Sequence, residues 1–141
     1  GLGALVAASA VVSWVVLDRP PKIRMTAPVS DSVNTGLRRR GILAQDDTAV
    51  FAFSPAGDQE PTLFVVAQRR VVVVAPHRLR GYPRDSVAFT FAPRWRTGPR
   101  LAFILLPAHG PPDTVFERLS LRGVWGMARE VRGLLPGGFR F

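Results

Sequence analysis

The chain has 141 residues, of which 47% are hydrophobic, and this is enough for one ordinary domain with a short appendage but too little for two full domains. Its 19 basic and 10 acidic residues give a net charge of +9, which favours an anionic partner such as a lipid headgroup, a nucleic acid or an acidic protein face. Cysteine is absent, which excludes disulfides, thiol nucleophiles and cysteine-ligated metal sites.

The first predicted element is an uncharged N-terminal segment of 17 apolar and small residues. This length is at the short limit for a membrane span, for which about 20 residues are usual, and a tryptophan near the polar end suits an interfacial anchor. We therefore predict a transmembrane helix over residues 1–18. Its candidate anchor residues are Leu5, Val12, Trp14 and Val16.

Three other interpretations of this segment remain open. Ala8, Ser9 and Ala10 form a small-residue site at which a secretory signal peptide is cleaved. A core helix of the domain is also compatible with an apolar run, although this run has no polar face. The third interpretation is a gene-start artefact ahead of a soluble protein that begins near Met25.

A basic, proline-containing stretch over residues 19–40 follows the apolar segment. Its basic residues outnumber the acidic ones, and this asymmetry places the globular part on the cytoplasmic side of the membrane. Three prolines and the polar run 30–36 predict a linker of about 20 residues, extended at first and flexible afterwards. The sequence thus predicts a single-pass membrane protein with a tethered cytoplasmic domain.

From residue 41 onward, short runs rich in valine, phenylalanine and isoleucine recur between turn residues, as in a strand-rich domain. The spacing leaves no room for helices between strands, so we expect an antiparallel sheet. The expected strands are 48–53, 62–67, 71–75, 86–92 and 101–106, with weaker candidates at 41–44 and 79–82.

The period becomes helical after Pro112. Asp113 or Ser120 can cap the start of this helix, and the Pro-Gly-Gly run at 136–138 ends it. We expect the apolar stripe of the helix to close an open end or face of the sheet. The stripe consists of Val124, Met127, Ala128, Val131, Leu134 and Leu135.

Residues 63–74, Leu-Phe-Val-Val-Ala-Gln-Arg-Arg-Val-Val-Val-Val, resemble the strand, turn and strand of bacterial pleckstrin-homology-like (PH-like) domains. Residues 77–87 are similar to the loop, polar-aromatic strand and proline-containing segment that follow in that family, although Ala67-Gln68 replaces the family's Thr-Asp.

This resemblance covers about residues 41–135 and implies an α+β, mainly β fold. The fold would be an antiparallel barrel or strongly curved sheet capped by one C-terminal helix, and such domains mostly bind lipids, peptides or protein partners. The resulting organisation is a transmembrane anchor over 1–18, a linker over 19–40 and a PH-like β domain with its C-terminal helix over 41–141.

Residues that carry catalysis are scarce. His77 and His109 each lie beside a proline in an expected loop, and the adjacent pair Asp46-Asp47 precedes an expected strand, where a solvated turn is typical. Neither histidine belongs to a metal-binding pattern, and no phosphate-binding loop or nucleophile motif is present in the sequence. We therefore predict no catalytic residue, no metal site and no cofactor.

Two groups of basic residues are candidate contacts for an anionic partner. All basic residues of the chain are arginines except Lys22. If the first group forms an exposed hairpin tip, its tryptophan can insert at a membrane interface while its arginines pair with lipid phosphates. The alternative is a tryptophan buried in the core beside solvated arginines. This first group is Arg94, Trp95, Arg96 and Arg100. The second group lies on two consecutive turns, where strand alternation could also separate the charges, and it is Arg69, Arg70, Arg78, Arg80 and Arg84.

Anchor, linker, small basic domain and missing catalytic motifs together predict a non-enzymatic binding or scaffold protein. We expect an accessory subunit that docks on the cytoplasmic face of a larger integral-membrane protein complex. Recognition of anionic lipid headgroups through the arginines is the alternative, with the anchor as a second attachment. Nucleic-acid binding is less favoured, because only Trp95 lies among the arginines and no RNA-binding signature is seen.

Overall fold

The computed structural model describes residues 20–55, 60–94 and 98–141. Within these ranges no helix is both long enough and apolar enough to cross a membrane. Several predicted residues lie outside the described residues, namely the anchor residues Leu5, Val12, Trp14 and Val16 and the hairpin residues Trp95 and Arg96.

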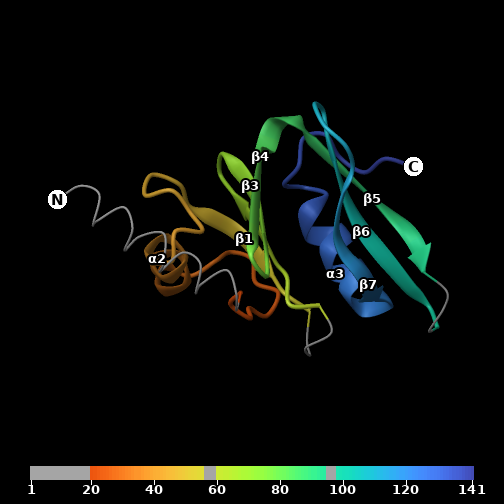
Figure 1. The fold of residues 1–141 in the computed structure, drawn as a ribbon, viewed down its shortest axis with the longest axis horizontal. Coiled ribbons are helices and arrows are strands. Elements are labelled where there is room, and N and C mark those ends of the chain that lie inside the picture. The colour runs from red at the N-terminus through yellow and green to blue at the C-terminus, as the bar shows by residue number, and fades with distance from the viewer. Residues whose placement is uncertain (1–19, 56–59, 95–97) are drawn as a thin grey trace.

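In the described part of the chain, seven strands form two antiparallel sheets, and within each sheet consecutive strands pair (Figure 1). The first sheet has the order β1-β2-β3-β4, with β1 (Ala49–Phe53), β2 (Leu63–Ala67), β3 (Arg70–Ala75) and β4 (Arg78–Pro83). A 3-10 helix, η1 (Arg84–Ser86), leads into the second sheet. That sheet has the order β5-β6-β7, with β5 (Val87–Arg94), β6 (Arg100–Pro107) and β7 (Asp113–Ser120).

The mainly β fold with a C-terminal helix is confirmed, but the described strands form two separate sheets instead of a closed barrel. The five main strand predictions and the weaker one at 79–82 are confirmed, whereas 41–44 is not a strand. The sequence prediction missed β7, because consecutive exposed residues at Glu117 and Arg118 interrupt its alternation. The helical region therefore begins later than Pro112 suggested.

The main core lies between the two sheets. Phe51, Phe64 and Val73 face it from the first sheet, and phenylalanines from β5, β6 and β7 face it from the second. Phe64 and Phe103 meet edge to face with ring centroids 5.1 Å apart, an arrangement that aromatic quadrupoles favour. These fully buried rings hold the sheets together.

The outer face of the first sheet is also buried, by helix α2 (Asp31–Arg39) and its neighbours. Figure 1 shows α2 on the side of this sheet that faces away from β5, β6 and β7. Leu37 packs in this second core cluster, and the buried Asn34 amide accepts from Ala49 N at 2.7 Å and donates to Ala49 O at 3.3 Å. Ser30 caps the helix by accepting from Val33 N.

These contacts differ from the extended and flexible linker expected over residues 19–40. The reason lies in β2 and β3, whose continuous apolar runs present side chains on both faces of the sheet. A sheet that is apolar on both faces needs a cover on both sides.

The chain just before α2 is also attached to the first sheet. Ser54 Oγ accepts from Ile23 N at 2.7 Å, and Ser54 N donates to Ile23 O at 2.9 Å. Thr26 and Ala52 exchange two backbone hydrogen bonds of 3.1 and 3.2 Å. The domain therefore begins by residue 23, close to the end of the apolar segment.

Helix α3 (Leu121–Val131) packs against the main core through Met127 and Val131. Of the two predicted caps, Ser120 is the one used, since its hydroxyl accepts from Gly123 N at 3.2 Å. Beyond the helix, residues 138–140 run beside β5, where Phe89 N donates to Gly138 O at 3.0 Å. The helix thus covers a face of the second sheet, as the apolar stripe predicted, and the tail beside β5 is an addition that the sequence did not predict.

Candidate functional site

The structure separates the second predicted arginine group. Arg69 lies at the β2–β3 turn and forms an exposed 2.8 Å ion pair with Asp46. Arg84, near the same end, donates to Leu134 O at 2.6 Å and Gln68 O at 3.4 Å. Arg70 extends over Gly81, and Arg78 is exposed at the opposite end of the β3–β4 hairpin. The five arginines do not converge on one site.

Arg80 instead joins the two sheets. Its Nε and Nη2 atoms donate to the two carboxylate oxygens of Asp113 at 2.6 and 2.8 Å, and these side chains are only 16% and 11% exposed. The Tyr82 hydroxyl donates to the same carboxylate at 2.5 Å. Burial raises the pKa of Tyr82, and the hydrogen bond and negative charge of Asp113 raise it further, against the opposing effect of Arg80. This cluster is structural.

The described residues of the first predicted group, Arg94 and Arg100, are paired at the ends of β5 and β6. Arg94 Nε lies 3.4 Å from Glu117 Oε2. Arg100, by contrast, lines a groove. Among the described arginines of the two predicted groups, Arg100 alone contributes to the cavity described next.

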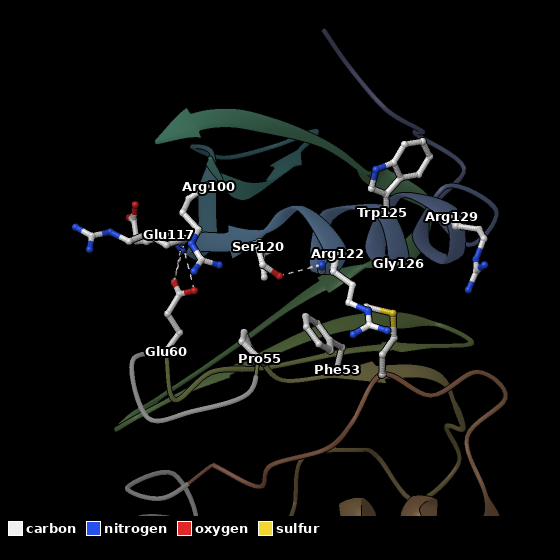
Figure 2. A pocket seen from close by; sticks show the side chains of 14 residues that line it. Phe53, Pro55, Glu60, Arg100, Glu117, Ser120, Arg122, Trp125, Gly126 and Arg129 are labelled. Atoms are coloured by element: carbon white, nitrogen blue, oxygen red, sulfur yellow. Dashed lines mark hydrogen bonds between the residues drawn. The ribbon is translucent and has the colours of Figure 1, made fainter. Parts of the chain in front are cut away.

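The groove has a volume of about 1310 Å³ and lies between the corner formed by β7 and α3 and the end of β1 (Figure 2). Its floor is apolar, and Figure 2 shows Phe53 and Pro55 on the side opposite α3. Charged residues surround this floor. The lining residues are Met25, Phe53, Pro55, Glu60, Arg100, Glu117, Arg118, Leu119, Ser120, Arg122, Gly123, Trp125, Gly126 and Arg129.

At one end of the groove, Glu60 accepts hydrogen bonds from the backbone of β7. Its Oε1 atom accepts from Glu117 N and from Arg118 N, the latter at 3.3 Å, and its Oε2 atom also accepts from Arg118 N at 3.3 Å (Figure 2). Glu117 and Arg118 lie where the β6–β7 register shifts, opposite the single residue Ala102. This β-bulge turns two successive N–H groups toward one acceptor.

Three arginines of the groove have no partner among the described residues. The side chains of Arg100, Arg118 and Arg122 form no hydrogen bond or ion pair there, although Glu60 and Glu117 line the same groove. Figure 2 shows Arg122 extending from α3 toward the floor. Unpaired guanidinium groups above an apolar floor suit a ligand that carries both negative charge and apolar surface.

Trp125 lies at the edge of the groove and is 76% exposed. Its ring points away from the side on which Phe53 lies (Figure 2). Arg122 and Arg129 stand three residues before and four residues after it, and therefore on the same face of α3. A tryptophan on the polar face of an amphipathic helix is a sequence signal that could have directed attention to this site.

The described residues contain no group of three or more histidine, aspartate or glutamate side chains placed to hold a metal. His77 and His109 are exposed and lie outside helices and strands, in loops as predicted. The expectation of a solvated Asp46-Asp47 turn is wrong for Asp47, which is buried and whose Oδ1 accepts from Thr48 N and Arg69 N. That carboxylate orders the β2–β3 turn.

Comparisons with family models, curated proteins and solved structures find no match to this chain. The chemistry of the groove is therefore derived from its own residues. Backbone N–H groups, guanidinium groups and an apolar floor together can bind an anionic, partly apolar group.

Proposed function

We propose that this chain is a non-enzymatic, membrane-tethered docking domain, an accessory subunit bound to the cytoplasmic face of an integral-membrane protein complex. The observation that supports this most is the groove at the β7–α3 corner. Three guanidinium groups without a partner among the described residues line an apolar floor there. Interfaces are enriched in arginine, and four arginines of the described residues line this groove.

The packing of residues 23–26 supports a position close to the membrane. If residues 1–18 span the bilayer, Met25, which lines the groove, comes only seven residues after Asp18. Seven residues reach at most about 25 Å when fully extended. The groove would therefore lie near the membrane surface, within reach of the cytoplasmic loops of a membrane protein.

We also propose that the domain is related to PH-like domains. Seven antiparallel strands followed by one helix agree with the order of elements that the sequence resemblance implies. The resemblance adds the expectation of a binding role for such a domain. It does not select the partner, which we infer from the groove.

Recognition of anionic lipid headgroups is the second candidate function. It is favoured by Trp125, which is 76% exposed between Arg122 and Arg129 on one face of α3. Tryptophan partitions to the bilayer interface, and nearby arginines attract anionic headgroups. This face would strengthen an attachment that the N-terminal segment provides.

Affinity purification through a C-terminal tag, after extraction of native membranes in mild detergent, tests the docking function. We expect the chain to retain an integral-membrane complex in a fixed stoichiometry. An Arg100→Gln/Arg122→Gln variant should lose this complex, whereas Arg39→Gln/Arg40→Gln, which removes two exposed charges from the other side of the molecule, should keep it. Recovery of the wild-type chain alone from the membrane fraction would refute the docking function.

A further inference from the structure

The β-bulge in β7 forms an anion-binding subsite inside the groove. Glu117 N and Arg118 N are successive backbone donors, and both donate to the carboxylate of Glu60. Concave arrangements of successive N–H groups bind anionic oxygens in many proteins. The subsite therefore accommodates a carboxylate.

The carboxylate that occupies this subsite belongs to the loop before β2 and to no secondary-structure element. Lys22 Nζ donates to the carbonyl oxygens of Pro55 at 3.3 Å and Glu60 at 3.4 Å, so the backbone of Glu60 is held by a contact separate from its carboxylate. A side chain on such a segment can leave the subsite without disrupting a helix or a strand pair.

Resting on the docking function above, we propose that the groove binds an acidic peptide segment of a partner protein, and that a partner carboxylate replaces Glu60 at Glu117 N and Arg118 N. A second acidic residue of the segment would pair with Arg122 or Arg100. Glu60 is thus an intramolecular competitor that holds the subsite in the free protein.

The surroundings of the subsite favour a peptide over a phosphorylated headgroup. Met25, Phe53 and Pro55 give the groove an apolar floor, which suits an aliphatic or aromatic side chain beside the carboxylate. Glu117, whose side chain is 62% exposed, adds negative charge at the same end and disfavours a dianionic phosphate there. Acidic side chains alternating with apolar ones match this lining.

The test measures fluorescence anisotropy of a short fluorescein-labelled peptide of alternating glutamate and phenylalanine, titrated with the full chain in mild detergent. We expect binding that weakens as salt increases, and much weaker binding of the matched peptide with glutamine in place of glutamate. Glu60→Ala should tighten binding about tenfold, because the peptide then no longer has to displace the charge-assisted hydrogen bonds of the Glu60 carboxylate. Glu60→Gln, whose amide oxygen still accepts, should give a smaller gain.

Two further variants separate the groove from net charge. Arg122→Gln should weaken binding about tenfold, whereas Arg39→Gln, with the same charge change on α2, should leave it within twofold. Unchanged affinity in both Glu60 variants would overturn the proposal. Equal losses in Arg122→Gln and Arg39→Gln would also overturn it, because they would indicate unspecific attraction to a basic surface.

The lipid alternative gives a different result. If Glu60→Ala increases binding to phosphatidylserine vesicles but not to the acidic peptide, the groove recognises a headgroup and the peptide proposal is wrong. If native membranes yield a complex that survives Arg100→Gln/Arg122→Gln, the docking function stands while this groove is not its contact. If no complex is recovered, the docking function itself fails.

Discussion

Replacing Asp113 by alanine tests whether the cluster that it forms with Arg80 and Tyr82 fastens the two sheets together. The change removes both acceptors of the Arg80 guanidinium and the acceptor of the Tyr82 hydroxyl. Among the described residues, no other carboxylate pairs with Arg80, so a nearly buried charge loses its counter-ion.

The expected cost follows from burial. Removing one member of a buried ion pair costs about 3–5 kcal/mol, and the 16% exposure of Arg80 places this variant near 3 kcal/mol. Arg80→Ala should cost less, about 2 kcal/mol, because Asp113 then keeps the hydrogen bond from Tyr82. Removal of the acid is therefore predicted to be more destructive than removal of the base.

Urea unfolding of the full chain in mild detergent, followed by circular dichroism, measures the free energy of unfolding. With an m-value of about 2 kcal/mol per molar urea, Asp113→Ala lowers the midpoint by about 1.5 M. Asp46→Ala is the control, since Asp46 also pairs with an arginine at 2.8 Å but both side chains are about 70% exposed, and it should cost less than about 1 kcal/mol. Equal costs for Asp46→Ala and Asp113→Ala, or a larger cost for Arg80→Ala than for Asp113→Ala, would refute this reasoning.

Tyr82 is the only tyrosine of the chain, so a phenolate absorbance titration should give a pKa above 10.0 that shifts back toward 10.0 in Asp113→Asn; an unchanged value would separate Tyr82 from Asp113. Because folding raises this pKa, the stabilisation is present below pH 10 and is lost as pH rises through the folded-state pKa, and Tyr82→Phe should lack that loss in alkaline unfolding curves. Gly36→Ala in α2, where an added Cβ meets nothing within 4 Å, should raise the free energy of unfolding by about 0.5–1 kcal/mol. Gly137→Ala should lower it by about 1–3 kcal/mol, since the new Cβ meets Val87 O, and a stable Gly137→Ala variant would contradict this packing.

The elements most accurately predicted were those whose signals are local. Alternating or continuous apolar runs predicted β1, β2, β3, β5 and β6 to within about two residues, and the apolar stripe predicted α3. Where the local signal is mixed, prediction failed. Two consecutive exposed residues, Glu117 and Arg118, interrupted the alternation of β7 and hid that strand. Residues 30–36 are mostly polar, so they did not indicate a helix, although α2 packs its few apolar side chains on the outer face of the first sheet.

The candidate site was less predictable than the fold. Arg100 belonged to a predicted group, but Arg118 and Arg122 did not, because they lie on separate elements, β7 and α3. Nothing in the sequence indicated that Arg80 would form an ion pair with Asp113, 33 residues away. Which arginine is paired and which is left unpaired depends on long-range contacts.

By itself, the sequence determined a basic chain without cysteine chemistry, a strand-rich domain and a C-terminal amphipathic helix, because charge, composition and short-range periodicity are local properties. The tertiary structure decided that the strands form two sheets instead of one closed barrel, and that residues 23–40 belong to the domain. It also decided that Glu60 lies against the bulge of β7, 57 residues away. Pairings at such separations depend on how whole sheets pack, and periodicity along the chain carries no record of them.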